Sequence, residues 1–101
     1  MYVRDVDYQL RMYTVRAGAM DAWVVEWRRH IEPLRRRFGF EVIGPWVIGD
    51  ENRFVWILGY GGADGWQAAD EAYYASAERR AIDPDPARHL LRTEQWMMRP
   101  V

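Results

Sequence analysis

The stretch that decides the fold is Arg53-Phe54-Val55-Trp56-Ile57-Leu58-Gly59-Tyr60, which is rich in residues that favour β-strands. Successive strand residues point to opposite faces, so Phe54 and every second residue after it share one face, while Val55 and Ile57 share the other. A strand with one face in water alternates apolar with polar residues, but this strand is apolar on both faces. We therefore predict that both faces of its sheet are covered. The alternation groups these residues by face, but it does not indicate which of the two faces packs against the helices of the chain.

Length and composition set the limits for the remaining interpretation. The 101 residues predict one domain, spanning 1–101, and the six Trp and six Tyr favour a dimer interface, a ligand cavity, or both. The net charge of -1 gives no field that would attract nucleic acid. The lack of Cys excludes disulfides and thiolate chemistry, and no apolar run approaches the roughly 20 residues that span a bilayer. We expect a cytoplasmic protein with no membrane or nucleic-acid partner.

Hydrophobic periodicity predicts strand, helix, strand, strand, helix and strand, in that order. The predicted ranges are about 7–16, 19–38, 40–48, 53–60, 65–75 and 89–98, with a short helical segment at 77–82. This order predicts an α+β, ferredoxin-like βαββαβ fold, a four-stranded antiparallel sheet with its helices on one face. The first and third strands are expected at the centre. Because the helices cover one face only, we predict that a second copy covers the other, forming a homodimer through the sheet face.

The long helix, residues 19–38, carries one apolar stripe at helical spacing. The stripe consists of Met20, Trp23, Val24, Trp27, Ile31, Leu34 and Phe38. Charged residues, including Arg35, are expected on the opposite, solvent-facing side. Pro33 lacks a backbone donor, which predicts a kink near Arg29 or His30.

Three further residues mark boundaries. Gly39 is predicted to cap the C-terminus of the long helix, and Ser76 to cap the start of the short segment at 77–82. Pro45 lies inside the second strand, where it predicts an edge position or a bulge, because proline cannot donate to a ladder.

The segment Tyr8-Gln9-Leu10-Arg11-Met12-Tyr13-Thr14-Val15-Arg16-Ala17-Gly18 resembles the opening strand and glycine turn of the NIPSNAP family. Further similar segments are Phe40 to Trp46, 50–56 and 73–79, so that the resemblance covers nearly the whole chain. It implies a dimeric α/β barrel, in which two ferredoxin-like subunits pack sheet to sheet. The wider superfamily includes cofactor-free monooxygenases, heme-degrading enzymes, lactone isomerases and polyketide cyclases, so the resemblance implies no particular reaction. In these proteins the ligand usually lies between the helices and the sheet of one subunit.

The two histidines are the only side chains that ordinarily titrate near neutral pH. His30, beside the apolar stripe, could bond a carbonyl freed by Pro33, or act as a general base or axial heme ligand at a pocket rim. His89 begins the last strand after an irregular loop, and a surface position at the strand start is the simpler interpretation for it. No carboxylate stands at ligand spacing from either histidine, so no metal site is predicted.

The strands at 7–16 and 89–98 are expected to be antiparallel neighbours, so Arg11, Arg92 and Glu94 are predicted to meet on one face. They could form an ion-pair network inside the dimer barrel, or a guanidinium group could orient an anionic or enolate-like ligand. Tyr13 follows Arg11 on the same face and could donate a hydrogen bond there.

A set of aromatic residues could either fill the core or line a cavity for a flat ligand. The set consists of Trp23, Trp27, Trp56, Tyr60, Trp66 and Tyr73. The candidate ligand-binding residues are Tyr13, Trp23, Trp27, Trp56, Trp66, Tyr73 and Glu94. Tyr60 is instead a candidate for proton transfer.

The function hypothesis is a small homodimer that binds or converts an aromatic or polyketide-like molecule. As an oxygenase, isomerase or cyclase without a cofactor, it would use His30 or Tyr60 for protons and Arg11 or Arg92 for developing negative charge. The alternatives are a ligand-binding protein without turnover, with heme among the candidate ligands, and an accessory or scaffold protein. The sequence has no phosphate-binding loop, Ser/His/Asp order or HExxH motif.

Overall fold

A computed structural model describes residues 5–101, and the first four residues of the predicted domain lie outside this part. The strands are β1 Asp7–Val15, β2 Glu41–Ile48, β3 Arg53–Tyr60 and β4 Leu90–Met98. The helices are α1 Met20–Glu26, α2 Glu32–Arg37, α3 Trp66–Ala75 and α4 Ala77–Arg80. A π-helical segment, Trp27–Ile31, joins α1 to α2, and 3-10 segments at Gly49–Glu51 and Pro86–His89 precede β3 and β4.

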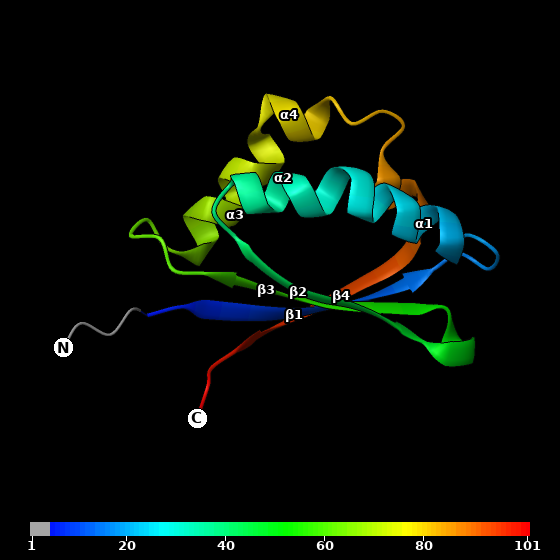
Figure 1. Cartoon of the computed structure of the whole chain (residues 1–101), viewed down its shortest axis with the longest axis horizontal. Helices are drawn as coiled ribbons and strands as arrows, with labels where there is room; N and C mark the ends of the chain where they lie inside the picture. The colour runs from blue at the N-terminus through cyan, green and yellow to red at the C-terminus, as the bar shows by residue number, and fades with distance from the viewer. Residues whose placement is uncertain (1–4) are drawn as a thin grey trace.

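The four strands form one antiparallel sheet in the order β2-β3-β1-β4, with the helices on one side of it (Figure 1). The predicted ferredoxin-like α+β fold is therefore confirmed, with β1 and β3 at the centre.

The core lies between the helices and β3. Phe54 and Trp56 are buried on the helix side of the sheet, and Trp27 packs edge-on against both, with ring centroids 5.3 and 5.2 Å away. Trp23 meets Phe54 in the same way at 5.5 Å. The face that the sequence left open is thereby assigned, because Trp56 and its alternating partners meet the helices of their own chain.

The opposite face of the sheet is apolar and only partly covered. Register pairs Leu10 with Ile57 and with Trp96, so these three side chains share that face. Trp96 is 49% exposed, and Trp46, opposite Val55, is 50% exposed. Residues 5–101 contribute no element that covers these side chains (Figure 1).

The kink predicted near Arg29 and His30 is present as the π-helical segment Trp27–Ile31. Its closing hydrogen bond runs from the amide of Glu32 to the carbonyl of Trp27, five residues back. Proline two residues into α2 lacks an amide donor, so the helix cannot continue its regular bonding through this point. The extra residue in the turn rotates everything that follows relative to α1.

The predicted boundary signals are also present. The amide of Phe40 bonds the carbonyl of Arg35, and Gly39, at φ +90°, bonds Arg36, which together make a glycine cap on α2. The hydroxyl of Ser76 accepts a hydrogen bond from the amide of Arg79 at 3.1 Å, capping α4. On the edge strand β2, the register shifts between Ile43 and Trp46, where Pro45 lies.

Candidate functional site

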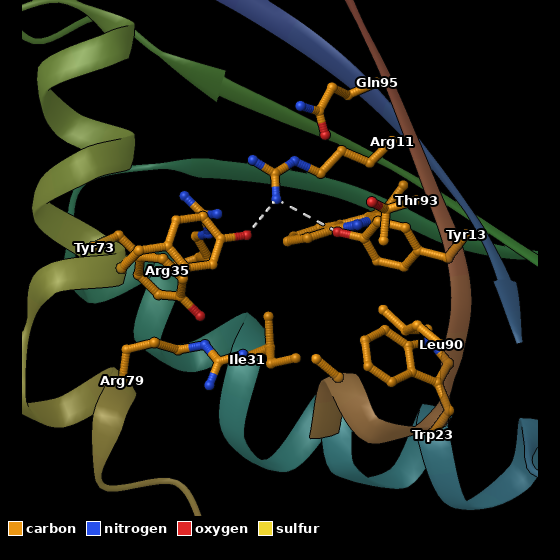
Figure 2. Close-up of a pocket in the computed structure, with 13 residues that line it drawn as sticks. Arg11, Tyr13, Trp23, Ile31, Arg35, Tyr73, Arg79, Leu90, Thr93 and Gln95 are labelled. Atoms are coloured by element: carbon orange, nitrogen blue, oxygen red, sulfur yellow. Dashed lines mark hydrogen bonds between the residues drawn. The ribbon is translucent and has the colours of Figure 1, made fainter. Parts of the chain in front are cut away.

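A cavity of about 120 Å³ lies between the helices and the half of the sheet formed by β1 and β4 (Figure 2). Figure 2 shows Tyr73 and Arg79 on one side of it and Trp23 and Leu90 on the other. The thirteen lining residues are Arg11, Tyr13, Trp23, Ile31, Arg35, Trp56, Tyr73, Tyr74, Arg79, Ala87, Leu90, Thr93 and Gln95. The wall combines aromatic rings with three guanidinium groups, and none of these described lining residues is acidic.

Arg11 is buried in the middle of β1 and has a hydrogen-bond partner for each of its three nitrogens. Nε donates to Gln9 Oε1 at 2.6 Å, and Nη2 donates to Asp70 Oδ1 at 3.1 Å. Nη1 donates to the hydroxyls of Tyr74 at 2.8 Å and Tyr13 at 3.4 Å. Each of these tyrosines accepts with its oxygen, so its own hydroxyl hydrogen remains free to donate. Arg11 thus holds two phenolic donors at the cavity wall.

Arg35 is fully buried, although it belongs to a helix that also carries solvent-facing arginines. Its guanidinium carbon lies 3.7 Å from the ring centroid of Tyr73 and 4.7 Å from that of Phe40. Stacking on aromatic faces suits a planar, weakly hydrated cation. Nη1 donates to Asp70 Oδ1 at 2.8 Å, the oxygen that also binds Arg11.

Asp70 on α3 therefore serves two buried arginines with one carboxylate oxygen. The cluster of Arg11, Arg35 and Asp70 has a formal charge of +1. The third cation of the cavity, Arg79, has its own partner, with Nη2 3.0 Å from Asp85 Oδ1. The electrostatic potential of the cavity is consequently positive.

The raised pKa values of Tyr13 and Tyr73 keep their hydroxyls protonated. Burial raises the pKa of Tyr13 above its ordinary value, against the opposing influence of Arg11. Burial likewise raises the pKa of Tyr73, against the neighbouring Arg35 and Arg79. Burial alone would lower the pKa of Arg11, but Tyr13, Tyr74 and Asp70 outweigh it and the pKa is raised. The cavity therefore presents hydrogen-bond donors throughout the neutral range.

Several buried donors around the cavity have no hydrogen-bond partner among residues 5–101. In the cavity wall these are Trp23 Nε1, Trp56 Nε1, Arg35 Nε and Nη2, Tyr73 Oη and Arg79 Nε. Native proteins leave few buried polar groups unpaired, because each one costs about 1–3 kcal/mol. Because these unpaired donors are concentrated at one cavity, they indicate a binding site rather than a general feature of the fold.

The cavity adjoins a second, larger hollow of about 650 Å³ beside α4. The two share Tyr74, Arg79 and Ala87 in their walls. These three residues therefore lie where the two spaces meet, at what we call the mouth of the cavity.

Five of the predicted site residues line the cavity: Arg11, Tyr13, Trp23, Trp56 and Tyr73. Trp27 and Trp66 are not among the lining residues. Trp27 is part of the core, and Trp66 packs on Phe40 at 5.3 Å. These two fill the helix–sheet layer, which was the alternative interpretation for the aromatic set.

Two of the residues proposed for proton transfer lie elsewhere. His30 lines a separate surface hollow of about 210 Å³, together with Arg29, Arg37 and Glu78. Tyr60 is near the start of α3, where its hydroxyl bonds Asp64 Oδ1 at 2.5 Å, and this bond raises its pKa. The other histidine, His89, contacts Glu26 at 2.7 Å.

The prediction that Arg11, Arg92 and Glu94 meet on one face is wrong. Arg11 lies opposite Gln95 and faces the helices, whereas Glu94 lies opposite Met12 and faces the uncovered side. Arg92 is with Glu94 on that side, 3.5 Å away. Over most of the pair, odd-numbered residues of β1 lie opposite odd-numbered residues of β4. Knowing where two strands begin and end does not determine this register.

Arg35 and Asp70 were missed by the sequence interpretation, and the solvent-facing position predicted for Arg35 is wrong. In the π-helical segment, residues four apart stay on one side of the helix. The buried side therefore carries Trp23, Trp27, Ile31 and then Arg35. The signal was Pro33, since a disrupted helix can bring a further residue to the buried side; Leu34 and Phe38 of the predicted stripe remain packed in the core beside Arg35.

In residues 5–101 no three His, Cys, Asp or Glu side chains form a group that could hold a metal ion. The same part of the chain includes no helix with the length and apolar character needed to cross a membrane.

The chain is similar to NIPSNAP proteins. The model of that family matches residues 8–101, and no curated protein matches. A NIPSNAP family protein from Agrobacterium tumefaciens is 18% identical with a TM-score of 0.84, covering 100% of this chain and 90% of the other. A NIPSNAP domain protein from Burkholderia xenovorans is 18% identical with a TM-score of 0.81, covering 94% of each chain. An antibiotic biosynthesis monooxygenase is 16% identical with a TM-score of 0.70, covering 94% of this chain and 98% of the other. At these identities the solved structures support the fold alone.

Proposed function

The chain belongs to the NIPSNAP family, and we propose that it binds a small, planar, oxygen-bearing molecule in the cavity between its helices and its sheet. The observation that carries this proposal is the buried Arg11, which holds the hydroxyls of Tyr13 and Tyr74 at the wall of an aromatic-lined cavity. Flat rings stack on aromatic walls, and a few fixed polar groups orient them.

The size of the cavity limits the ligand. A cavity of roughly 150 Å³ holds one benzene molecule, and this one has about 120 Å³. It suits a single ring whose substituents extend through the mouth into the adjoining hollow. A heme or a fused polyketide is too large for the inner cavity, which favours smaller ligands over those two candidates.

The charges of the wall suit a ligand with an electron-rich oxygen. The cluster of Arg11, Arg35 and Asp70 keeps one positive charge in a water-poor site, where it would stabilise negative charge on a phenolate or enolate oxygen. The described lining residues include no histidine or carboxylate that could remove a proton. Binding therefore has stronger support than turnover, and a substrate for turnover would have to enter already ionised.

Oxygenation is the second candidate function. The similarity in fold to an antibiotic biosynthesis monooxygenase supports it. An ionised phenol or enol bound in the cavity could react with dioxygen without a protein-derived base. Oxygen uptake in the presence of such compounds is the assay for this candidate.

The test of binding is a titration with single-ring phenols, followed by the melting temperature and the indole N–H resonances of the six tryptophans. Trp23 and Trp56 should shift, because they line the cavity. Ala87→Trp should abolish these shifts by filling the mouth, whereas Ala72→Trp, at an exposed position of α3, should not. Shifts that survive Ala87→Trp unchanged would place the ligand elsewhere.

We also propose that a second copy of the chain covers the open sheet face. The apolar side chains of that face, among them Ile57 and Trp96, belong to adjacent strands, and burying them against a copy would remove a large apolar patch from water. A second copy also fits the expectation that both faces of β3 are covered. The cavity lies on the other side of the sheet, so dimer formation would leave it accessible.

A further inference from the structure

We propose that the cavity has a dedicated anion subsite, formed by Arg35, Tyr73 and Arg79, and that its ligand is a single-ring carboxylate. This inference rests on the proposed function, because it concerns the same cavity. It adds the charge of the ligand and the direction in which the ligand binds.

Arg35 offers its carboxylate-binding edge. Nη1 is occupied by Asp70, while Nε and Nη2 have no partner among the described residues. These two nitrogens carry parallel N–H bonds along one side of the guanidinium group, an arrangement that matches the two oxygens of a carboxylate. Arg11, by contrast, has all three nitrogens engaged. The charged group of a ligand is therefore expected at Arg35 rather than at Arg11.

Two further donors belong to the same end of the cavity. Tyr73 is 1% exposed, and its hydroxyl has no partner within residues 5–101. Figure 2 shows that hydroxyl directed towards the interior, near Arg79. Arg79 contributes Nε, which is buried and likewise unpaired in the described part of the chain. Tyr73 stacks on Arg35 at 3.7 Å, so the three side chains form one cluster.

The charge balance supports a monoanion. Arg11 and Arg35 share the single carboxylate of Asp70, which leaves one positive charge, and Arg79 is balanced by Asp85. A ligand with one negative charge would neutralise the buried excess. Its ring would lie against Trp23 and Leu90, on the other side of the cavity. A neutral ring of the same size would leave the excess charge and the unpaired donors as they are.

The test compares benzoate with benzamide, which has nearly the same shape and no charge. Each is titrated into the full chain, and the indole N–H resonances are followed by NMR. Benzoate should shift Trp23 and Trp56 and leave Trp46 and Trp96, on the open sheet face, unchanged. Its affinity should exceed that of benzamide by about tenfold, the effect of one charge-assisted hydrogen bond.

Tyr73→Phe removes one unpaired hydroxyl and is expected to fold, so it avoids the risk of altering the buried Arg35. It should weaken benzoate binding about tenfold or more, the lower end of the range for one lost hydrogen bond to a charged group, and weaken benzamide binding less, because a neutral carbonyl is the weaker acceptor. Tyr60→Phe, which removes a hydroxyl bonded to Asp64 outside the cavity, is the matched control and should bind benzoate normally.

The outcomes separate the subsite from the function. Equal affinity for benzoate and benzamide at Trp23 and Trp56 would overturn the anion subsite and leave ligand binding in the cavity intact. Unchanged benzoate affinity in Tyr73→Phe would overturn the assignment to this end of the cavity. Failure of benzoate, benzamide and the phenols alike to shift Trp23 or Trp56 would overturn both proposals.

Discussion

Tyr73 and Tyr74 are neighbours on α3 whose hydroxyls have opposite surroundings. The hydroxyl of Tyr73 is buried without a partner in residues 5–101, whereas that of Tyr74 accepts a hydrogen bond from Arg11 at 2.8 Å. Without ligand, Tyr73→Phe should raise the free energy of unfolding by about 1 kcal/mol, since an unpaired buried group is removed. Tyr74→Phe should lower it by about 1 kcal/mol. Urea denaturation measures both, and a loss of stability in Tyr73→Phe would contradict the prediction.

Asp70 is the only carboxylate bonded to Arg11 and Arg35 in the described part of the chain. Asp70→Asn should therefore destabilise the fold by about 3 kcal/mol, because it leaves two buried cations without a counter-charge. Glu71→Gln is the control, since this exposed neighbour bonds Gln67 only on the surface. It should change the free energy of unfolding by less than about 0.5 kcal/mol. Similar effects of the two substitutions in urea would contradict the buried network.

Glu26 connects α1 to the segment before β4. Its carboxylate accepts hydrogen bonds from both terminal nitrogens of Arg88, Nη1 and Nη2, and contacts the ring of His89. The hydrogen bonds from Arg88 hold the pKa of Glu26 below its ordinary value. Its contribution is therefore complete above the ordinary glutamate pKa and is lost as the pH falls through the lower, folded-state pKa. Glu26→Gln should lower stability by about 1 kcal/mol at pH 7, where the partly exposed ion pair is intact, and by less near pH 3, where protonation begins to remove the carboxylate. An equal effect at both pH values in urea would argue against this.

At the scale of the element, the π-helical segment Trp27–Ile31 sets the direction of Arg35. Deleting the exposed Arg29 should remove the extra residue of the π-helical turn and rotate α2 by about 100° relative to α1. Arg35 would then leave Asp70, and the free energy of unfolding should fall by about 3 kcal/mol. Arg29→Ala keeps the chain length and should change stability by less than about 0.5 kcal/mol. Calorimetry of the two variants distinguishes helix geometry from loss of a side chain.

The elements themselves were predictable because their signals are local. Period-two and helical spacing marked the strands and helices, Gly39 and Ser76 marked helix ends, and Pro45 marked the irregularity inside β2. The site was predictable only in part. Arg11 and Tyr13 were identified from the expected pairing of the first and last strands. Arg35 was missed because an extra residue in a helical turn rotates the residues after it by about 100°.

Features that depend on pairing between distant segments could not be read from the chain. The face occupied by Arg92 and Glu94 follows from the register of β4 against β1. The positions of His30 and Tyr60 outside the cavity follow from tertiary packing: His30 shares a hollow with Glu78, and Tyr60 bonds Asp64. A one-residue shift of β4 against β1 would bring Arg92 and Glu94 to the other face, and composition is insensitive to it.

For the whole molecule, dimer formation through the sheet face makes a simple prediction. Ile57→Arg places a charge in the middle of the open face and should give a monomer of about the chain mass of 12.0 kDa by sedimentation. The unaltered chain should sediment at twice that mass. Val25→Arg, an apolar-to-charged change on an exposed position of α1, should remain dimeric. A monomeric unaltered chain at micromolar concentration would contradict the proposed assembly.

Pro45 and the register shift beside it leave the sheet with one regular edge instead of two. Open-ended stacking of molecules needs one edge that adds and a different edge that accepts the next molecule. With β2 interrupted, β4 is the only continuous edge template within residues 5–101, and pairing of β4 with another β4 closes after two molecules. Edge contacts alone can therefore join molecules in pairs but cannot extend a stack, so the interruption of β2 removes one route to fibrous polymerisation.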